Sequence, residues 1–116
     1  MLSNTQYCFS TRFENGIGTN PEELVAAAHA GCFSMALSAQ LGNAGIVAER
    51  ISTIATLTME KLDVDWTVTE VHLDVMAKIP GDDPTAFETA ANNAKTGCPI
   101  SRLLNTKITM EGRLER

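Results

Sequence analysis

The chain has 116 residues and a formal net charge of -5 at pH 7, and 44% of its residues are hydrophobic. This length predicts one domain covering residues 1–116, since neither a linker nor a repeat divides the sequence. The acidic balance, without a basic cluster, argues against nucleic acid and anionic membranes as partners. The first fifteen residues hold no basic segment followed by an apolar run, so we expect no signal peptide and a cytoplasmic protein. Three cysteines in that reducing compartment favour packed thiols or redox chemistry over a disulfide framework.

A short strand is expected near the start of the chain. Tyr7, Phe9 and Phe13 alternate with polar residues, which is the period of a half-buried strand. Arg12 lies among these aromatic residues, and by itself it is most simply interpreted as a solvated surface charge.

A long helix over Asn20–Ala39 is the element around which the rest is organised. Asn20 is a suitable N-cap, Pro21 fits the first helical position, and Glu23 completes a start similar to a capping box. Small residues surround Cys32, and few charges follow Glu23, so we expect a central helix that is buried on most sides. Its alanine, serine, histidine and glutamine content makes it too weakly apolar for a membrane span.

Two half-buried strands should follow this helix. Apolar and polar residues alternate over Ile51–Glu60 and again over Val71–Ile79. Residues 61–65 are the expected hairpin turn, and a change of phase predicts a bulge near Thr69 and Glu70.

The remaining elements are two helices and a strand. A helix should run over Pro84–Thr96 with Asp83 as its cap, and a short third helix over Ile100–Asn105 with Cys98 as its N-cap. Thr106–Glu115 alternates as a closing strand. The order predicts an α+β domain with its helices against one face of a mostly antiparallel sheet.

Two cysteines are candidates for chemistry. Cys32 sits in the middle of a helix rich in small residues, where burial alone would raise its pKa, so reactivity needs a nearby cation or hydrogen-bond donor. A packed core cysteine is the alternative. Cys98 sits at a helix N-terminus, where free N–H groups and the helix dipole favour a thiolate. Two thiols near helices in a reducing compartment suggest a transient disulfide, although their separation in sequence does not give a distance in space.

Two other residues of the long helix carry weaker signals. Glu22 lies about three turns, or ~15 Å, before Cys32, so it cannot touch that thiol directly. It could hold an arginine that reaches the sulfur, or it could simply be a first-turn carboxylate favoured by the dipole. His29 lies one turn before Cys32 and could act as a base, but no ligand spacing typical of zinc accompanies it. We therefore expect neither a metal nor another cofactor.

Four separated blocks together resemble a known family. They are Tyr7-x-Phe9-x-Thr11-Arg12-Phe13, Gly18-Thr19-Asn20-Pro21-Glu22-Glu23-Leu24, Ala28-His29-Ala30-x-Cys32-Phe33-Ser34-Met35-Ala36-Leu37, and Gly97-Cys98-Pro99-x-Ser101. In this order they strongly resemble the OsmC branch of the OsmC/Ohr thiol peroxidases, and the similarity runs from about Tyr7 to the last strand. The position of Arg12 is similar to that in the OsmC branch, since the Ohr branch takes its arginine from further upstream.

The resemblance implies a role for each candidate residue. Cys32 would be the peroxidatic thiol, Arg12 the cation that stabilises its thiolate, Glu22 the carboxylate that fixes Arg12, and Cys98 the resolving thiol. Organic hydroperoxides would be favoured over hydrogen peroxide, and dihydrolipoyl groups are the implied dithiol reductants. The family resemblance also implies an intertwined homodimer with active sites at the subunit interface.

Two departures from the family pattern are visible. Family members carry an N-terminal β-hairpin before the Tyr-x-Phe segment, which this sequence lacks, so we expect a misassigned start or a shortened form. Cys8 stands where the family pattern often has glycine and could form side disulfides. Two alternatives to a peroxidase therefore remain open. One is a shortened domain that senses redox state or binds a ligand without turnover, and the other is a purely structural dimerisation module.

Overall fold

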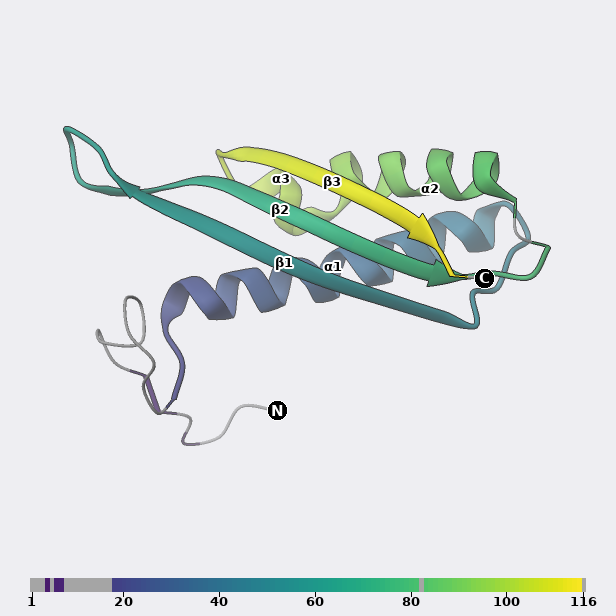
Figure 1. The fold of residues 1–116 in the computed structure, drawn as a ribbon, viewed down its shortest axis with the longest axis horizontal. Helices are drawn as coiled ribbons and strands as arrows, with labels where there is room; N and C mark the ends of the chain where they lie inside the picture. The colour runs from purple at the N-terminus through teal and green to yellow at the C-terminus, as the bar shows by residue number, and fades with distance from the viewer. Residues whose placement is uncertain (1–3, 5, 8–17, 82, 116) are drawn as a thin grey trace.

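The computed structural model describes residues 4, 6–7, 18–81 and 83–115. Its elements in chain order are helix α1 (Pro21–Asn43), strands β1 (Arg50–Lys61) and β2 (Trp66–Lys78), helices α2 (Pro84–Gly97) and α3 (Pro99–Leu103), and strand β3 (Lys107–Leu114). Figure 1 shows the three strands side by side as one sheet, with the helices together behind it. The predicted α+β class and the predicted order from the long helix onward are confirmed, whereas most of the short strand predicted over Tyr7, Phe9 and Phe13 lies outside the described residues.

Helix α1 begins as its sequence predicts. The Asn20 side chain accepts a hydrogen bond from the backbone N–H of Glu23 at 2.8 Å, and Pro21 occupies the first turn. Such a cap satisfies one of the N–H groups that have no partner inside the helix. The helix continues about one turn beyond the predicted end, to Asn43, and Gly45 follows with a φ of 77° that favours glycine.

Strands β1 and β2 form a long antiparallel hairpin whose tip extends beyond the helices (Figure 1). Thr58 pairs with Glu70 and Met59 with Val68, which leaves Thr69 as the extra residue of a bulge. The bulge reverses which side chains face the core, as the change of apolar phase predicts.

Strand β3 adds to the other edge of β2 in parallel, from Glu70 opposite Lys107 to Ala77 opposite Leu114. The sheet of the described residues therefore combines one antiparallel pair with one parallel pair, in the order β1-β2-β3. This differs from the expectation of a mostly antiparallel sheet. The physical reason is the connection: a parallel neighbour needs a crossover, and α2 and α3 supply it.

The core lies between the sheet and the helices. From His29 to Leu41 every fourth residue of α1 is buried, and from Val71 to Ala77 every second residue of β2 is buried, which are the periods of a helix stripe and a strand face. The fully buried apolar side chains are Phe33, Leu37, Leu41, Val71, Leu73, Val75 and Ala77. Helix α2 adds Phe87, Ala90, Ala91 and Ala94 to this cluster.

Helix α1 is central, but within one chain only a single stripe of it is buried. Met35 is 76% exposed, and Ala27, Ala28 and Gly31 are exposed as well. Among the described residues, the sheet, α2 and α3 cover one side of the helix only, so these elements do not give the expected burial on most sides. By length and composition α1 could cross a membrane, so the expectation that it is too weakly apolar for a span is not met. This is weak evidence for a membrane span, because the core helix of a soluble protein passes the same test.

Candidate active site

Two thiols that are far apart in sequence meet between α1 and α3. The Sγ atoms of Cys32 and Cys98 lie 2.8 Å apart and share a hydrogen bond, although 66 positions separate the two residues. Cys98 is completely buried, and Cys32 is partly exposed. Both thiols are free, so the pair is in its reduced, dithiol state. The two sulfur atoms would need to approach each other by less than about 1 Å to reach the ~2.05 Å length of a disulfide bond.

The protonation of Cys32 is set by opposing contacts. Burial raises the pKa of the Cys32 thiol above its ordinary 9.0, and the hydrogen bond with Cys98 raises it further. The backbone N–H of Ile100 hydrogen-bonds to the Cys32 sulfur and lowers the pKa. An N–H donor in the first turn of α3 therefore stabilises the Cys32 thiolate. The sequence instead predicts that this helix end stabilises a Cys98 thiolate. Cys98 is the N-cap residue of α3, but its side chain makes no capping hydrogen bond.

A second contact crosses between the same two helices. Nε2 of His29 lies 2.8 Å from Oγ of Ser101, and both residues are buried. Nδ1 of His29 is buried and has no hydrogen-bond partner among the described residues. Burial lowers the pKa of His29, so its ring is neutral at physiological pH. Sequence reasoning considered His29 as a base and assigned no role to Ser101. The sequence does contain a signal for this pair: His29 lies three residues before Cys32, and Ser101 lies three residues after Cys98.

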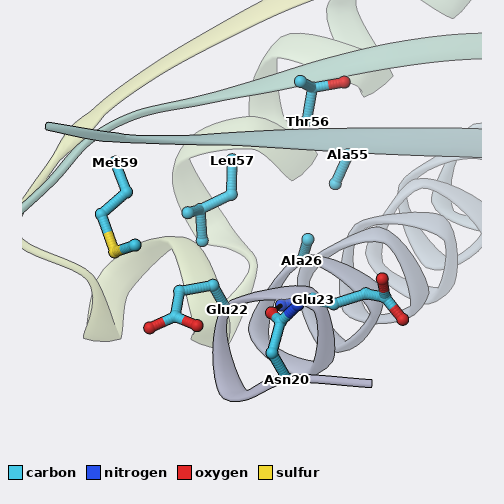
Figure 2. A pocket seen from close by; sticks show the side chains of 8 residues that line it. All are labelled: Asn20, Glu22, Glu23, Ala26, Ala55, Thr56, Leu57 and Met59. Atoms are coloured by element: carbon cyan, nitrogen blue, oxygen red, sulfur yellow. Dashed lines mark hydrogen bonds between the residues drawn. The ribbon is translucent and has the colours of Figure 1, made fainter. Parts of the chain in front are cut away.

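Glu22 lies elsewhere on α1. It lines a pocket of about 480 Å³ between the first turns of α1 and the strand β1. Figure 2 shows Glu22 and Glu23 pointing to opposite sides of the helix, with Leu57 and Met59 of β1 above Glu22. The residues that line this pocket are Asn20, Glu22, Glu23, Ala26, Ala55, Thr56, Leu57 and Met59. Glu22 remains about 15 Å from Cys32 along the helix axis, as the sequence predicts.

Arg12 and Cys8 lie outside the described residues. The contact between Arg12 and either Glu22 or Cys32 therefore stays a prediction. Of the four predicted site residues, the structure brings Cys32 and Cys98 together and leaves Glu22 at the far end of the same helix. Within the described part of the chain, no group of three or more His, Cys, Asp and Glu side chains could hold a metal ion.

These features define a class of protein: an α+β domain with a close thiol pair between its central helix and a short helix. Comparison with known proteins narrows the class. The sequence profile of the OsmC-like protein family matches residues 13–112. The chain is 44% identical over 115 residues to peroxiredoxin OsmC of Escherichia coli (strain K12), an alignment that covers 99% of this chain and 80% of that protein.

Two further relatives agree with this result. The chain is 34% identical over 99 residues to an organic hydroperoxide resistance protein-like protein of Mycoplasma pneumoniae, covering 80% of this chain and 68% of that protein. An OsmC-like protein of unknown function from Vibrio cholerae has a similar fold, with a TM-score of 0.73 at 20% identity, over 82% of this chain and 64% of that one. The chain therefore spans less than two thirds of that solved structure. This protein belongs to the OsmC-like protein family, as the four sequence blocks predict.

Proposed function

We propose that this protein is a cysteine-based peroxidase that reduces organic hydroperoxides and, more weakly, hydrogen peroxide. The observation that carries the proposal is the 2.8 Å separation of the Cys32 and Cys98 sulfurs. Names of relatives support it, since one is called a peroxiredoxin and another an organic hydroperoxide resistance protein-like protein.

The proposed reaction has two chemical steps on the protein. The Cys32 thiolate attacks the O–O bond of the hydroperoxide, which gives Cys32 sulfenic acid and an alkoxide that takes up a proton to become the alcohol. The Cys98 thiolate then attacks the sulfenic sulfur, a Cys32–Cys98 disulfide forms, and the hydroxyl leaves as water after it takes up a proton. An external dithiol, such as a dihydrolipoyl group, reduces the disulfide and restores both thiols.

In this proposal Arg12 supplies the positive charge that Cys32 needs. The described contacts on balance raise the pKa of Cys32, so a further cation is required for a reactive thiolate at neutral pH. Glu22 would hold Arg12 by a charge-assisted pair. Support for this assignment is the match of both residues to the family blocks, together with the half-buried position of Glu22 at a pocket wall.

We also propose that the protein acts as a cytoplasmic homodimer. Helix α1 exposes Met35 at 76% and Leu24 at 37%, beside the small residues Ala27, Ala28 and Gly31. A second copy on this face would remove apolar area from water and complete the burial of the central helix.

A steady-state assay with an alkyl hydroperoxide and dihydrolipoamide tests the proposal. We expect Cys32→Ser to abolish peroxide consumption. Cys98→Ser should permit one turnover and then stall with Cys32 over-oxidised, which mass spectrometry detects as sulfinic acid. Cys8→Ser is the matched control, because it removes a cysteine to which we assign no step.

The outcomes separate the alternatives. Equal and undiminished activity in the Cys32 and Cys98 variants would reject the peroxidase. A wild-type protein that forms the Cys32–Cys98 disulfide but does not cycle with any dithiol would favour a redox-sensitive domain without turnover. Thiols that remain unreactive toward peroxide would favour a structural dimerisation module.

A further inference from the structure

Two side-chain contacts join α1 to α3, one helical turn apart. The first joins Cys32 to Cys98, and the second joins His29 to Ser101. His29 precedes Cys32 by three residues, whereas Ser101 follows Cys98 by three. Because residues three apart lie on the same side of a helix, the two contacts are successive links between the same pair of helix faces.

A histidine at the buried position of His29 opposes folding. It belongs to the buried stripe of α1 that otherwise consists of Phe33, Leu37 and Leu41, and it is 0% exposed. One ring nitrogen has no partner among the described residues, and a buried polar atom without a hydrogen bond opposes folding. An apolar side chain would fill this position of the stripe without that cost, so the contact with Ser101 is the feature that distinguishes His29 from its neighbours.

Helix α3 needs such a contact. It has five residues, Pro99–Leu103, and a helix of this length has no stability of its own in water. Its position is therefore decided by what holds it to the rest of the protein. Both groups that meet the Cys32 sulfur, the Cys98 thiol and the Ile100 N–H, come from its N-terminal end.

We propose that His29 and Ser101 form a positioning pair that holds the start of α3 against α1, so that Cys98 and the Ile100 N–H stay in contact with Cys32. The pair itself takes part in no bond making or breaking. The role of the His29–Ser101 pair in catalysis rests on the proposed peroxidase function, but the effect of the pair on the two thiols does not require that function.

The test uses the whole 116-residue chain with Cys8→Ser, so that only two cysteines remain. The dithiol–disulfide equilibrium of Cys32 and Cys98 is measured against reduced and oxidised dithiothreitol, to which two electrons and two protons pass when the protein disulfide forms. Ser101→Ala should shift this equilibrium toward the dithiol by about threefold to tenfold, the range expected for one buried hydrogen bond. Ser101→Thr keeps a hydroxyl and should recover part of the shift.

A second readout follows the Cys32 thiolate. With Cys98→Ser added, the pH dependence of alkylation by iodoacetamide reports the pKa of Cys32. Ser101→Ala should move the midpoint to higher pH, because the Ile100 N–H then no longer stays at the sulfur.

The chain offers a matched control on the opposite face of the sheet. Nδ1 of His72 lies 2.7 Å from Oγ1 of Thr109, which is also a histidine–hydroxyl pair. Thr109→Val removes that hydroxyl as Ser101→Ala does and should change neither readout. Equal shifts in both variants would mean a general loss of stability and would overturn the proposal, as would an unchanged equilibrium in Ser101→Ala.

A double variant separates positioning from folding. His29→Phe with Ser101→Ala replaces both partners by apolar groups, which restores much of the stability that a single deletion loses. We expect its thermal unfolding to stay near that of the Cys8→Ser protein while the disulfide equilibrium remains shifted. A normal equilibrium in the double variant contradicts the proposal, even where Ser101→Ala alone fails to fold. If the shifts appear but no peroxide is consumed, only the proposed function fails.

Discussion

Oxidation of the thiol pair should stabilise this protein strongly. A Cys32–Cys98 disulfide would close a loop of 66 residue positions in the unfolded chain. The chain-entropy relation then gives a loss of about 15 cal/mol/K in the unfolded state, or ~4 kcal/mol at 25 °C. Because the sulfurs already lie 2.8 Å apart, little rearrangement of the folded state should offset this gain.

The gain can be expressed as a melting temperature. Unfolding entropies of about 2.1 cal/mol/K per residue give ~0.24 kcal/mol/K for a chain of 116 residues. A stabilisation of ~4 kcal/mol therefore raises Tm by up to about 17 °C, and native-state strain would reduce that value.

The assay compares thermal unfolding of the oxidised and reduced Cys8→Ser protein at one protein concentration, because association also shifts Tm. A control with Cys98→Ser added should unfold at the same temperature under both conditions. An oxidised protein that melts no higher than the reduced one, with the disulfide verified by mass spectrometry, would refute the reasoning that these thiols are poised to join.

Three further predictions concern stability. Leu37→Ala, at a fully buried core position, should lower the unfolding free energy by about 2–5 kcal/mol in urea titrations, whereas the exposed Ser38→Ala should leave it nearly unchanged. Asp83→Ala removes the acceptor for two N–H groups in the first turn of α2 and should cost about 1 kcal/mol in the same measurement. Burial holds the pKa of His29 below its ordinary 6.5, so the unfolded chain binds more protons and stability should fall as pH drops below 6.5. Urea titrations at several pH values below 6.5 should show a smaller fall in the unfolding free energy for His29→Phe. An equal fall would contradict protonation of His29 as its cause.

The sequence predicts most of the local structure correctly because the signals are local. Asn20 and Asp83 cap their helices through neighbours only two or three residues away. Alternation along β1 and β2 fixes which side chains face the core, and the change of phase locates the bulge at Thr69. Four sequence blocks are enough to identify the family, which the comparisons confirm.

The site is predicted less completely, since it depends on residues that are distant in sequence. The small residues around Cys32 and the helix start at Cys98 make these two thiols candidates, but their contact depends on how α3 packs against α1. The role of the Ile100 N–H is likewise invisible in the sequence, because any residue carries such a group. Glu22 is located correctly at three turns from Cys32, and the proposed bridge through Arg12 stays a prediction.

What the sequence alone determined is the set of elements, their order and the family, since caps, periodicity and motifs act over a few residues. Only the tertiary structure decided that β3 runs parallel to β2, that one chain buries a single stripe of α1, and that His29 meets Ser101. Each of these depends on how the two helices after β2 cross over the sheet and pack on α1. That packing is a collective result of the whole core, and no short stretch of sequence encodes it.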